Sequence, residues 1–497
     1  MSVDDPVQGT ERTVPAPADD PAAGPADAPA EGPRGGWSVL RPLVLRLHFY
    51  AGLLVAPFLL VAAVTGLLYA ASIQIEKVVY ADELTVPVGE STVPVARQVE
   101  SALDAHPDGK LTAVWPSAED GATTRVLLSA PGVEEGKSLA VFVDPYTAEV
   151  RGSLESYGSS GALPFRAWVS ELHRHLHLGE PGRVYSEMAA SWLWVVALGG
   201  LLLWIGRRRT ARGSRGVRGL LLPERGATGR RRTLSWHGAV GIWAFLGLLF
   251  LSATGLTWST YAGANIDVLR TELRGATPAI NASLDGGTAG AGHGDHAGGH
   301  GGEGDGGQDK GPDIGLDRVL EIADERKLTG SPVEIAVPTE PGTAYVVKQT
   351  DKQWPVHLDA MAVDPGTGEV TDELRFADHP LLAQLTRYGI DAHMGLTFGL
   401  ANQLALMGLS LGLILLIVWG YVMWWQRRPT KSRRRGAGRP MPRGAWRRVP
   451  LPVLLPLAGV AAVAGWFVPL LGISLVAFLA VDIVLGAVGR RRGAPAA

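Results

Sequence analysis

Apolar residues are gathered into long blocks along the chain, and polar residues fill the stretches between them. Four blocks are each long enough to cross a bilayer, which takes about 20 helical residues. They lie near 43–72, 188–206, 236–261 and 396–425. A fifth block, 451–489, has room for two short spans, and Trp466 and Pro469 indicate a turn at its middle. The pattern predicts an integral membrane protein.

Basic residues are concentrated in three of the polar stretches, at 207–234, at 426–450 and after residue 489. The positive-inside rule places these stretches and both termini in the cytoplasm. The acidic segments 73–187 and 262–392 then lie outside the cell membrane. The formal net charge of −2 does not reveal this asymmetry. We expect no nucleic-acid partner.

These patterns divide the chain into membrane helices, cytoplasmic loops and two outer segments. The predicted segments are a disordered cytoplasmic tail (1–36), the first span (37–75), an outer domain (76–165), an outer histidine segment with the second span (166–206), a basic loop (207–234), the third span (235–261), a Gly/His-rich flexible insert (262–312), a second outer domain (313–385), a second outer histidine segment with the fourth span (386–426), a basic loop (427–450), a hairpin of two helices (451–489) and a cytoplasmic tail (490–497).

The chain also repeats itself. The helix "LHFYAGLLVAPFLLVAAVTGLLYA", which contains His48, matches "WHGAVGIWAFLGLLFLSATGLTWS", which contains His237. The outer segments "VFVDPYTAEVRG" and "MAVDPGTGEVTD" match as well. The number of positions between their matching residues, the second spacing, is constant, but it differs from the number that separates the two matching helices. Each outer copy has a short amphipathic helix followed by alternating strands, so we expect an α-helical membrane bundle of two duplicated halves with two small α+β domains outside.

The second spacing selects among the three histidines of "SELHRHLHLGEPGR". It aligns His173 with His393, whereas His175 and His177 fall opposite Gly395 and Thr397. Only His173 therefore has a partner in the other half. The alternative that His177 serves instead stays open, because residues four apart share one face of a helix.

The predicted topology arranges four histidines as two pairs. His48 and His237 lie near the cytoplasmic side, and His173 and His393 lie near the outer side. Histidines at membrane helices are costly, so a function is the default interpretation. Two imidazoles facing each other are the axial ligands of a low-spin b-type haem. The chain has no cysteine, which excludes thiolate haem ligands and cysteine-bound iron–sulfur clusters.

Other residues fit a flat macrocycle between the helices. Gly52 and Gly241 each follow a histidine by four positions, so they lie on the same helical face and leave room there. Arg46, Arg174 and Arg183 are placed where haem propionates need charged partners. Zinc fits less well, because two imidazoles alone leave it short of ligands.

The tract "GHGDHAGGHGGEGDGGQD" offers a separate candidate metal site. His293, His296 and His300 lie in a setting rich in glycine, and such tracts can collect Cu, Zn or Ni. A flexible spacer is the alternative, because ordering the tract around an ion costs conformational entropy.

The segments "LHFYAG", "ELHRHLHLGEPGR", "SWHGAVG" and "DAHMGLTFG", with the two "VDPxTxEV" segments, resemble the PepSY-associated transmembrane family over roughly residues 37–428. The resemblance implies that the outer domains are PepSY modules. It also implies two b-type haems held by His48, His173, His237 and His393, as in similar membrane reductases that pass electrons to ferric siderophore iron outside.

On this basis we expect a di-haem membrane oxidoreductase in iron uptake. No strand–GxGxxG–helix unit appears in the sequence, so the electron donor would be a cytoplasmic partner or a membrane quinol. Two alternatives remain at this stage. One is a non-enzymatic PepSY membrane protein that binds or regulates a peptidase or senses a ligand, and the other is a metal-handling permease.

Overall fold

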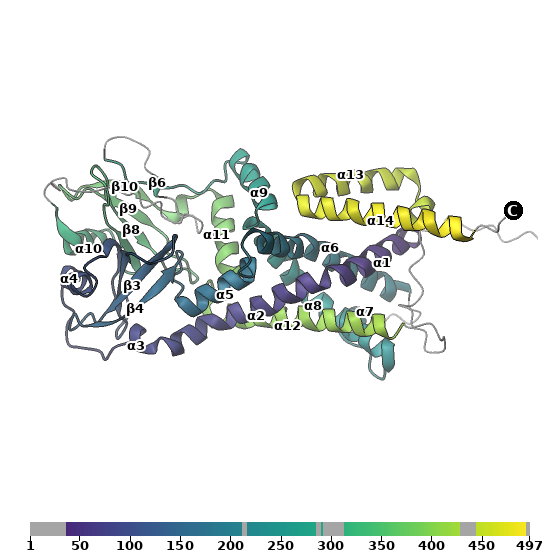
Figure 1. The fold of residues 1–497 in the computed structure, drawn as a ribbon, viewed down its shortest axis with the longest axis horizontal. Coiled ribbons are helices and arrows are strands. Elements are labelled where there is room, and N and C mark those ends of the chain that lie inside the picture. Colours follow the sequence, from purple (N-terminus) through teal and green to yellow (C-terminus); the bar gives the residue numbers. More distant parts are fainter. Residues whose placement is uncertain (1–35, 211–215, 285–289, 292–312, 428–443, 494–497) are drawn as a thin grey trace, which may run out of the picture.

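The strands gather at one end of the molecule, and the long helices extend away from them (Figure 1). The structure is a computed structural model. It describes residues 36–210, 216–284, 290–291, 313–427 and 444–493.

Five helices among the described residues are long and apolar enough to cross a membrane. They are α2 (Ala56–Val79), α6 (Glu180–Thr210), α8 (Gly229–Thr257), α12 (Gly399–Trp425) and α14 (Pro469–Gly493). Helix α2 packs against α12, and α6 packs against α8. The chain is therefore a helical, multi-pass membrane protein whose core joins helices from its two halves of sequence.

The first span was expected as one helix over 37–75, and the structure corrects this. It contains two helices, α1 (Gly36–Leu54) and α2, with a break at Val55. Pro57 causes the break, because proline has no N–H to donate to the carbonyl of Leu53. That carbonyl instead accepts a hydrogen bond of 3.1 Å from the hydroxyl of Tyr421 in α12.

Eight strands of the two outer segments form one sheet rather than two separate ones. Its order is β10-β9-β8-β7-β1-β2-β3-β4. The strands are β1 (Lys110–Trp115), β2 (Thr124–Ser129), β3 (Lys137–Val143), β4 (Val150–Tyr157), β7 (Val333–Ala336), β8 (Tyr345–Gln349), β9 (Ala360–Val363) and β10 (Val370–Leu374). The two four-stranded groups meet where β1 pairs antiparallel with β7, with Val114 opposite Ile335.

Two amphipathic helices, α4 (Val95–Ala105) and α10 (Gly315–Glu325), belong to a single hydrophobic core with the sheet. Val114 and Ile335 are completely buried in this core. Asp317 of α10 also accepts a hydrogen bond of 2.7 Å from the backbone N–H of Val95, which begins α4. The two four-stranded groups and their helices thus share one hydrophobic core, and Asp317 of one group caps the first turn of α4 in the other.

Short helices connect the sheet to the membrane spans. Helix α5 (Pro164–His175) precedes α6, and α11 (Leu381–His393) precedes α12. At the base of α5, Arg166 forms a buried ion pair with Glu76 of α2, at 3.1 Å. The remaining short helices are α3 (Ala81–Leu84), α7 (Gly216–Leu221) and the 3₁₀ turns η1 (Phe376–Asp378) and η2 (Ala445–Arg448).

The segment 262–312, predicted to be a flexible insert, is ordered in its first part. It contains α9 (Tyr261–Glu272) and the strand β5 (Ile280–Asn281), which pairs with β6 (Gly290–Ala291). Helix α9 begins against Glu187, whose carboxylate accepts hydrogen bonds from the backbone N–H groups of Tyr261 and Ala262.

The C-terminal hairpin is present as α13 (Leu451–Phe467) and α14, with the turn at Val468. Helix α14 contacts α6, where the indole N–H of Trp192 donates to the hydroxyl of Ser474 at 2.8 Å. It also reaches α1, where Asp482 forms an ion pair with Arg46. The hairpin is therefore attached to the side of the bundle near α1 and α6 (Figure 1).

Candidate functional site

His48 of α1 and His237 of α8 face each other within the bundle and form the inner pair. Their ring centroids are 6.4 Å apart, and the ring planes are inclined by 78°. A metal bound midway between two imidazole nitrogens, with metal–nitrogen bonds of ~2.0–2.1 Å, requires ring centroids roughly 6 Å apart. The spacing of the inner pair fits that requirement.

Each ring of the inner pair is held by its Nδ1 atom. His48 Nδ1 lies 3.0 Å from the carbonyl oxygen of Val196, and His237 Nδ1 lies 3.1 Å from that of Leu416. A carbonyl oxygen only accepts, so both Nδ1 atoms carry the hydrogen. The Nε2 atom of each neutral ring then keeps a lone pair for a metal, as in proteins whose metal-bound histidines donate their other N–H to a carbonyl.

Glycines let α6 approach the inner pair closely. A Cβ atom at Gly199 or Gly200 would lie 3.4 or 3.0 Å from atoms of the His48 side chain. The glycines expected to leave room were Gly52 and Gly241. Gly52 does border open space, whereas a Cβ at Gly241 would lie 3.7 Å from Leu416.

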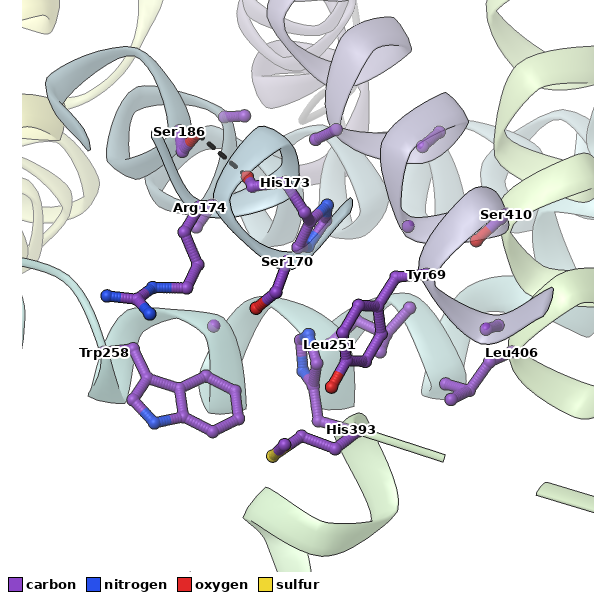
Figure 2. A pocket seen from close by; sticks show the side chains of 18 of the residues that line it. Tyr69, Ser170, His173, Arg174, Ser186, Leu251, Trp258, His393, Leu406 and Ser410 are labelled. Atoms are coloured by element: carbon purple, nitrogen blue, oxygen red, sulfur yellow. Dashed lines mark hydrogen bonds between the residues drawn. The ribbon is translucent and has the colours of Figure 1, made fainter. Parts of the chain in front are cut away.

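His173 and His393 form the outer pair, and both line one cavity of about 250 Å³. Figure 2 shows the two imidazoles among Tyr69, Leu251 and Leu406, with Trp258 beside them. The rings of His393 and Trp258 meet edge to face at 5.3 Å. The cavity is walled mainly by apolar side chains of the spans, with polar groups toward the sheet.

The outer rings also form their hydrogen bonds through Nδ1, but the partners are threonine hydroxyls. His173 Nδ1 lies 2.9 Å from Oγ1 of Thr65, and His393 Nδ1 lies 2.6 Å from Oγ1 of Thr254. Burial lowers the pKa of both imidazoles well below the ordinary value of 6.5. Both rings are therefore neutral at pH 7 and able to offer a nitrogen lone pair.

His177 lies away from this cavity. Helix α5 ends at His175, and His177 follows in a turn with a left-handed backbone, φ 53°. Its Nε2 atom is 3.1 Å from the carbonyl of Trp168, its Nδ1 atom is 3.3 Å from a carboxylate oxygen of Glu171, and its ring stacks on that of Trp168. The geometry thus favours His173 as the outer candidate.

Two of the three arginines expected to partner a bound anion lie at the outer cavity. Arg174 and Arg183 both line it. Arg174 donates to the hydroxyl of Tyr157, and Arg183 donates to that of Thr260 at 3.2 Å. Arg46 instead forms its ion pair with Asp482 of the hairpin.

A comparison with models of known families matches residues 45–427 to the PepSY-associated TM region. The chain belongs to this family. No curated protein matches the chain. The matched range includes both histidine pairs and their hydrogen-bond acceptors, whereas the hairpin α13–α14 lies beyond it.

The other candidate metal ligands in this member of the PepSY-associated family cannot be placed. His293, His296 and His300 lie outside the described residues. Within the ranges that the structure describes, no three histidine, cysteine, aspartate or glutamate side chains gather as a metal site.

Sequence reasoning did not assign a role to Thr65, Thr254 or Gly66. A Cβ at Gly66 would lie 3.3 Å from Cε1 of His173, so this glycine makes room for the ring. The sequence signal for these residues was the Thr-Gly-Leu triplet, which occurs in both matching helices of this PepSY-associated chain. The triplet indicated that the two helices correspond, but not which side chain each residue would contact.

Proposed function

We propose that this protein is a membrane oxidoreductase that holds two b-type haems and passes electrons across the bilayer to a ferric complex outside. The observation that carries the proposal is the orientation of the four histidines. Each ring is anchored by Nδ1, which leaves Nε2 for a shared metal. Haem ligated by two imidazoles supplies a one-electron couple without an open coordination position, which suits electron transfer.

The surroundings of both pairs support haem over a bare ion. At the inner pair, the 6.4 Å ring separation matches axial ligation by two histidines. At the outer pair, His173 and His393 line a cavity with apolar walls, and two guanidinium groups lie at its rim. Arg174 and Arg183 would hold the propionates there through charge-assisted hydrogen bonds.

The contacts also support the proposed duplication. His48 and His237 are 189 positions apart, as are Thr65 and Thr254. His173 and His393 are 220 positions apart, as are the acceptors Val196 and Leu416. Ligand and acceptor therefore recur together, so each half would contribute one histidine to each pair.

Orientation follows from the basic loops. With 207–234 and 426–450 in the cytoplasm of a cell-membrane protein, the inner pair lies nearer the cytoplasm and the outer pair nearer the sheet. Electrons would enter at His48 and His237 from a cytoplasmic partner or a quinol. They would leave at His173 and His393.

The mouth of the outer cavity would receive the electron acceptor. It is lined by Tyr157 at the end of β4, by Ser159 and Ser160 in the turn that follows, and by Arg174. One electron converts bound Fe(III) to Fe(II), which hard oxygen chelators hold far less tightly, so delivery of electrons alone would release iron. Under this proposal the sheet of the PepSY-type domains covers the mouth of the outer cavity, where electrons would leave.

Optical spectroscopy of the protein purified in detergent tests the proposal. We expect a low-spin b-type spectrum on reduction and two haems per chain by pyridine haemochrome assay, and electron transfer to a ferric chelate after reduction. Protein produced with ample haem and still lacking haem absorbance would overturn the proposal and leave a non-enzymatic, regulatory role as the better interpretation.

A further inference from the structure

The outer histidines differ from the inner ones in the chemistry of their hydrogen-bond acceptor. Backbone carbonyls hold His48 and His237, whereas side-chain hydroxyls hold His173 and His393. A hydroxyl both donates and accepts, so the protonation of the outer rings depends on where the threonine hydrogen points.

The threonine hydrogens are directed to the helix backbone. Thr65 Oγ1 lies 2.8 Å from the carbonyl oxygen of Val61, and Thr254 Oγ1 lies 2.7 Å from that of Phe250. Two oxygens approach this closely only when one donates, and a carbonyl has no hydrogen to give. Each threonine therefore donates its one hydrogen to its own helix.

The threonine oxygen can then only accept from the imidazole. His173 and His393 must carry their hydrogen on Nδ1, which leaves the Nε2 lone pair free. Donation to the helix carbonyl also polarises the hydroxyl and makes its oxygen a better acceptor. The same arrangement occurs in both halves, on α2 and on α8.

We propose that Thr65 and Thr254 are positioning residues that fix the tautomer and orientation of His173 and His393 toward the outer haem. This inference rests on the proposed function. The two residues of each Thr-Gly pair have different roles. The threonine holds the ring, and Gly66 or Gly255 leaves space beside it, with Cε1 of the histidine 3.3 or 3.8 Å from the position of an added Cβ.

The hydrogen bond has a consequence that can be measured. An Nδ1–H that donates to an acceptor makes the imidazole a more basic ligand, and a more basic ligand favours oxidised over reduced iron. Loss of the threonine oxygen should raise the midpoint potential of the outer site. The inner site should be unchanged, because its acceptors are backbone carbonyls.

The experiment compares Thr65→Val and Thr254→Val with Thr65→Ser and Thr254→Ser in the haem-loaded protein. Spectroelectrochemistry gives two midpoint potentials, and electron paramagnetic resonance gives the low-spin ferric signals. We expect each valine variant to shift one potential upward and alter one signal, and each serine variant to restore the wild-type values. Ser72→Ala is the matched control, because Ser72 is a buried hydroxyl of α2 that bonds to the carbonyl of Tyr69 without a histidine.

The outcomes separate this inference from the proposed function. Two haems with potentials and signals unchanged in both valine variants would overturn the positioning role and leave the function intact. If a valine variant loses one haem, recovery of that haem in the serine variant supports the inference, and failure to recover contradicts it. Wild-type protein without haem would overturn both.

Discussion

Each histidine of the two pairs is anchored within its own half of the chain and faces a histidine from the other half. His48 is held by α6 and His237 by α12, while His173 is held by α2 and His393 by α8. The Nδ1 hydrogen bonds therefore join residues of the same half, whereas the contact between the two histidines of a pair joins different halves. Movement of one half against the other would change the pairs without breaking a single anchor.

The outer ligand can be identified with two alanine variants. Under the proposed function, His173→Ala should reduce the haem content of the purified protein from two per chain to one, because it would remove an axial ligand. His177→Ala should retain both, because that ring is stacked on Trp168 and bonded to Glu171. Pyridine haemochrome assay measures the ratio. A loss of haem in His177→Ala with none in His173→Ala would reverse the assignment.

The limits of sequence reasoning are visible at these residues. Equal spacing of repeats identified His173 and His393 as equivalent, and it set His175 and His177 apart from them. It could not reveal the acceptors, because a hydrogen bond between Thr65 and His173 depends on the packing of α5 against α2. It also could not reveal that Arg46 pairs with Asp482, which lies in a helix without a counterpart in the repeat.

At the scale of elements, the hairpin α13–α14 is attached to the bundle by apolar packing around its turn, at Val468 and Leu471, and by a few polar contacts along α14. No residue of α13 is buried by the rest of the described chain. The ion pair between Asp482 and Arg46 lies within the candidate span of α14, and Arg46 is only 8% exposed. Charges in such a position are costly unless they are paired.

Removing one member of this pair should therefore destabilise the protein. We expect Asp482→Asn to lower the free energy of unfolding by ~3 kcal/mol, the typical cost of breaking a buried ion pair by removing one of its charges. Thermal unfolding in detergent, followed by circular dichroism, measures the loss as a lower Tm.

The double variant Arg46→Leu with Asp482→Leu is the control for that experiment. It replaces both charges by apolar groups of similar size, so it should lose less stability than Asp482→Asn alone. A single variant as stable as the wild type would show that the pair does not hold the hairpin.

The apolar pattern predicted most helices, because long hydrophobic blocks have few alternatives in a membrane. It did not predict the break at Val55, although Pro57 was visible in the sequence, since a proline in a span is tolerated when a neighbour takes up the freed carbonyl. Tyr421, more than 360 positions away, does so here. The joining of β1 to β7 was not predictable for a similar reason: pairing between distant strands leaves no local signal.

At the scale of the whole molecule, the sheet lies toward one end of the spans with α5 and α11, which carry His173 and His393. Helix α7, which belongs to the basic stretch 207–234, lies toward the other end (Figure 1). The two ends of the molecule therefore differ in charge, and the net charge of −2 does not reveal this difference. The proposed direction of electron flow requires the sheet to be outside the cell.

The absence of cysteine makes this orientation directly testable. A single cysteine at the exposed Glu321 of α10 should react with a membrane-impermeant maleimide in intact cells. One at the exposed Arg225, between α7 and α8, should react only after the membrane is permeabilised. The reverse labelling pattern would contradict the orientation, and the unmodified chain serves as the blank.

The pairing of β1 with β7 also constrains the order of events during synthesis. β1 ends at Trp115, and β7 does not begin until Val333, so two further spans must be made before the partner strand exists. Until then the first four strands present an open edge beside their own core. Completion of the sheet is thus a late step in the biogenesis of each chain, and any chain that stops short of Val333 carries an unprotected edge strand at β1.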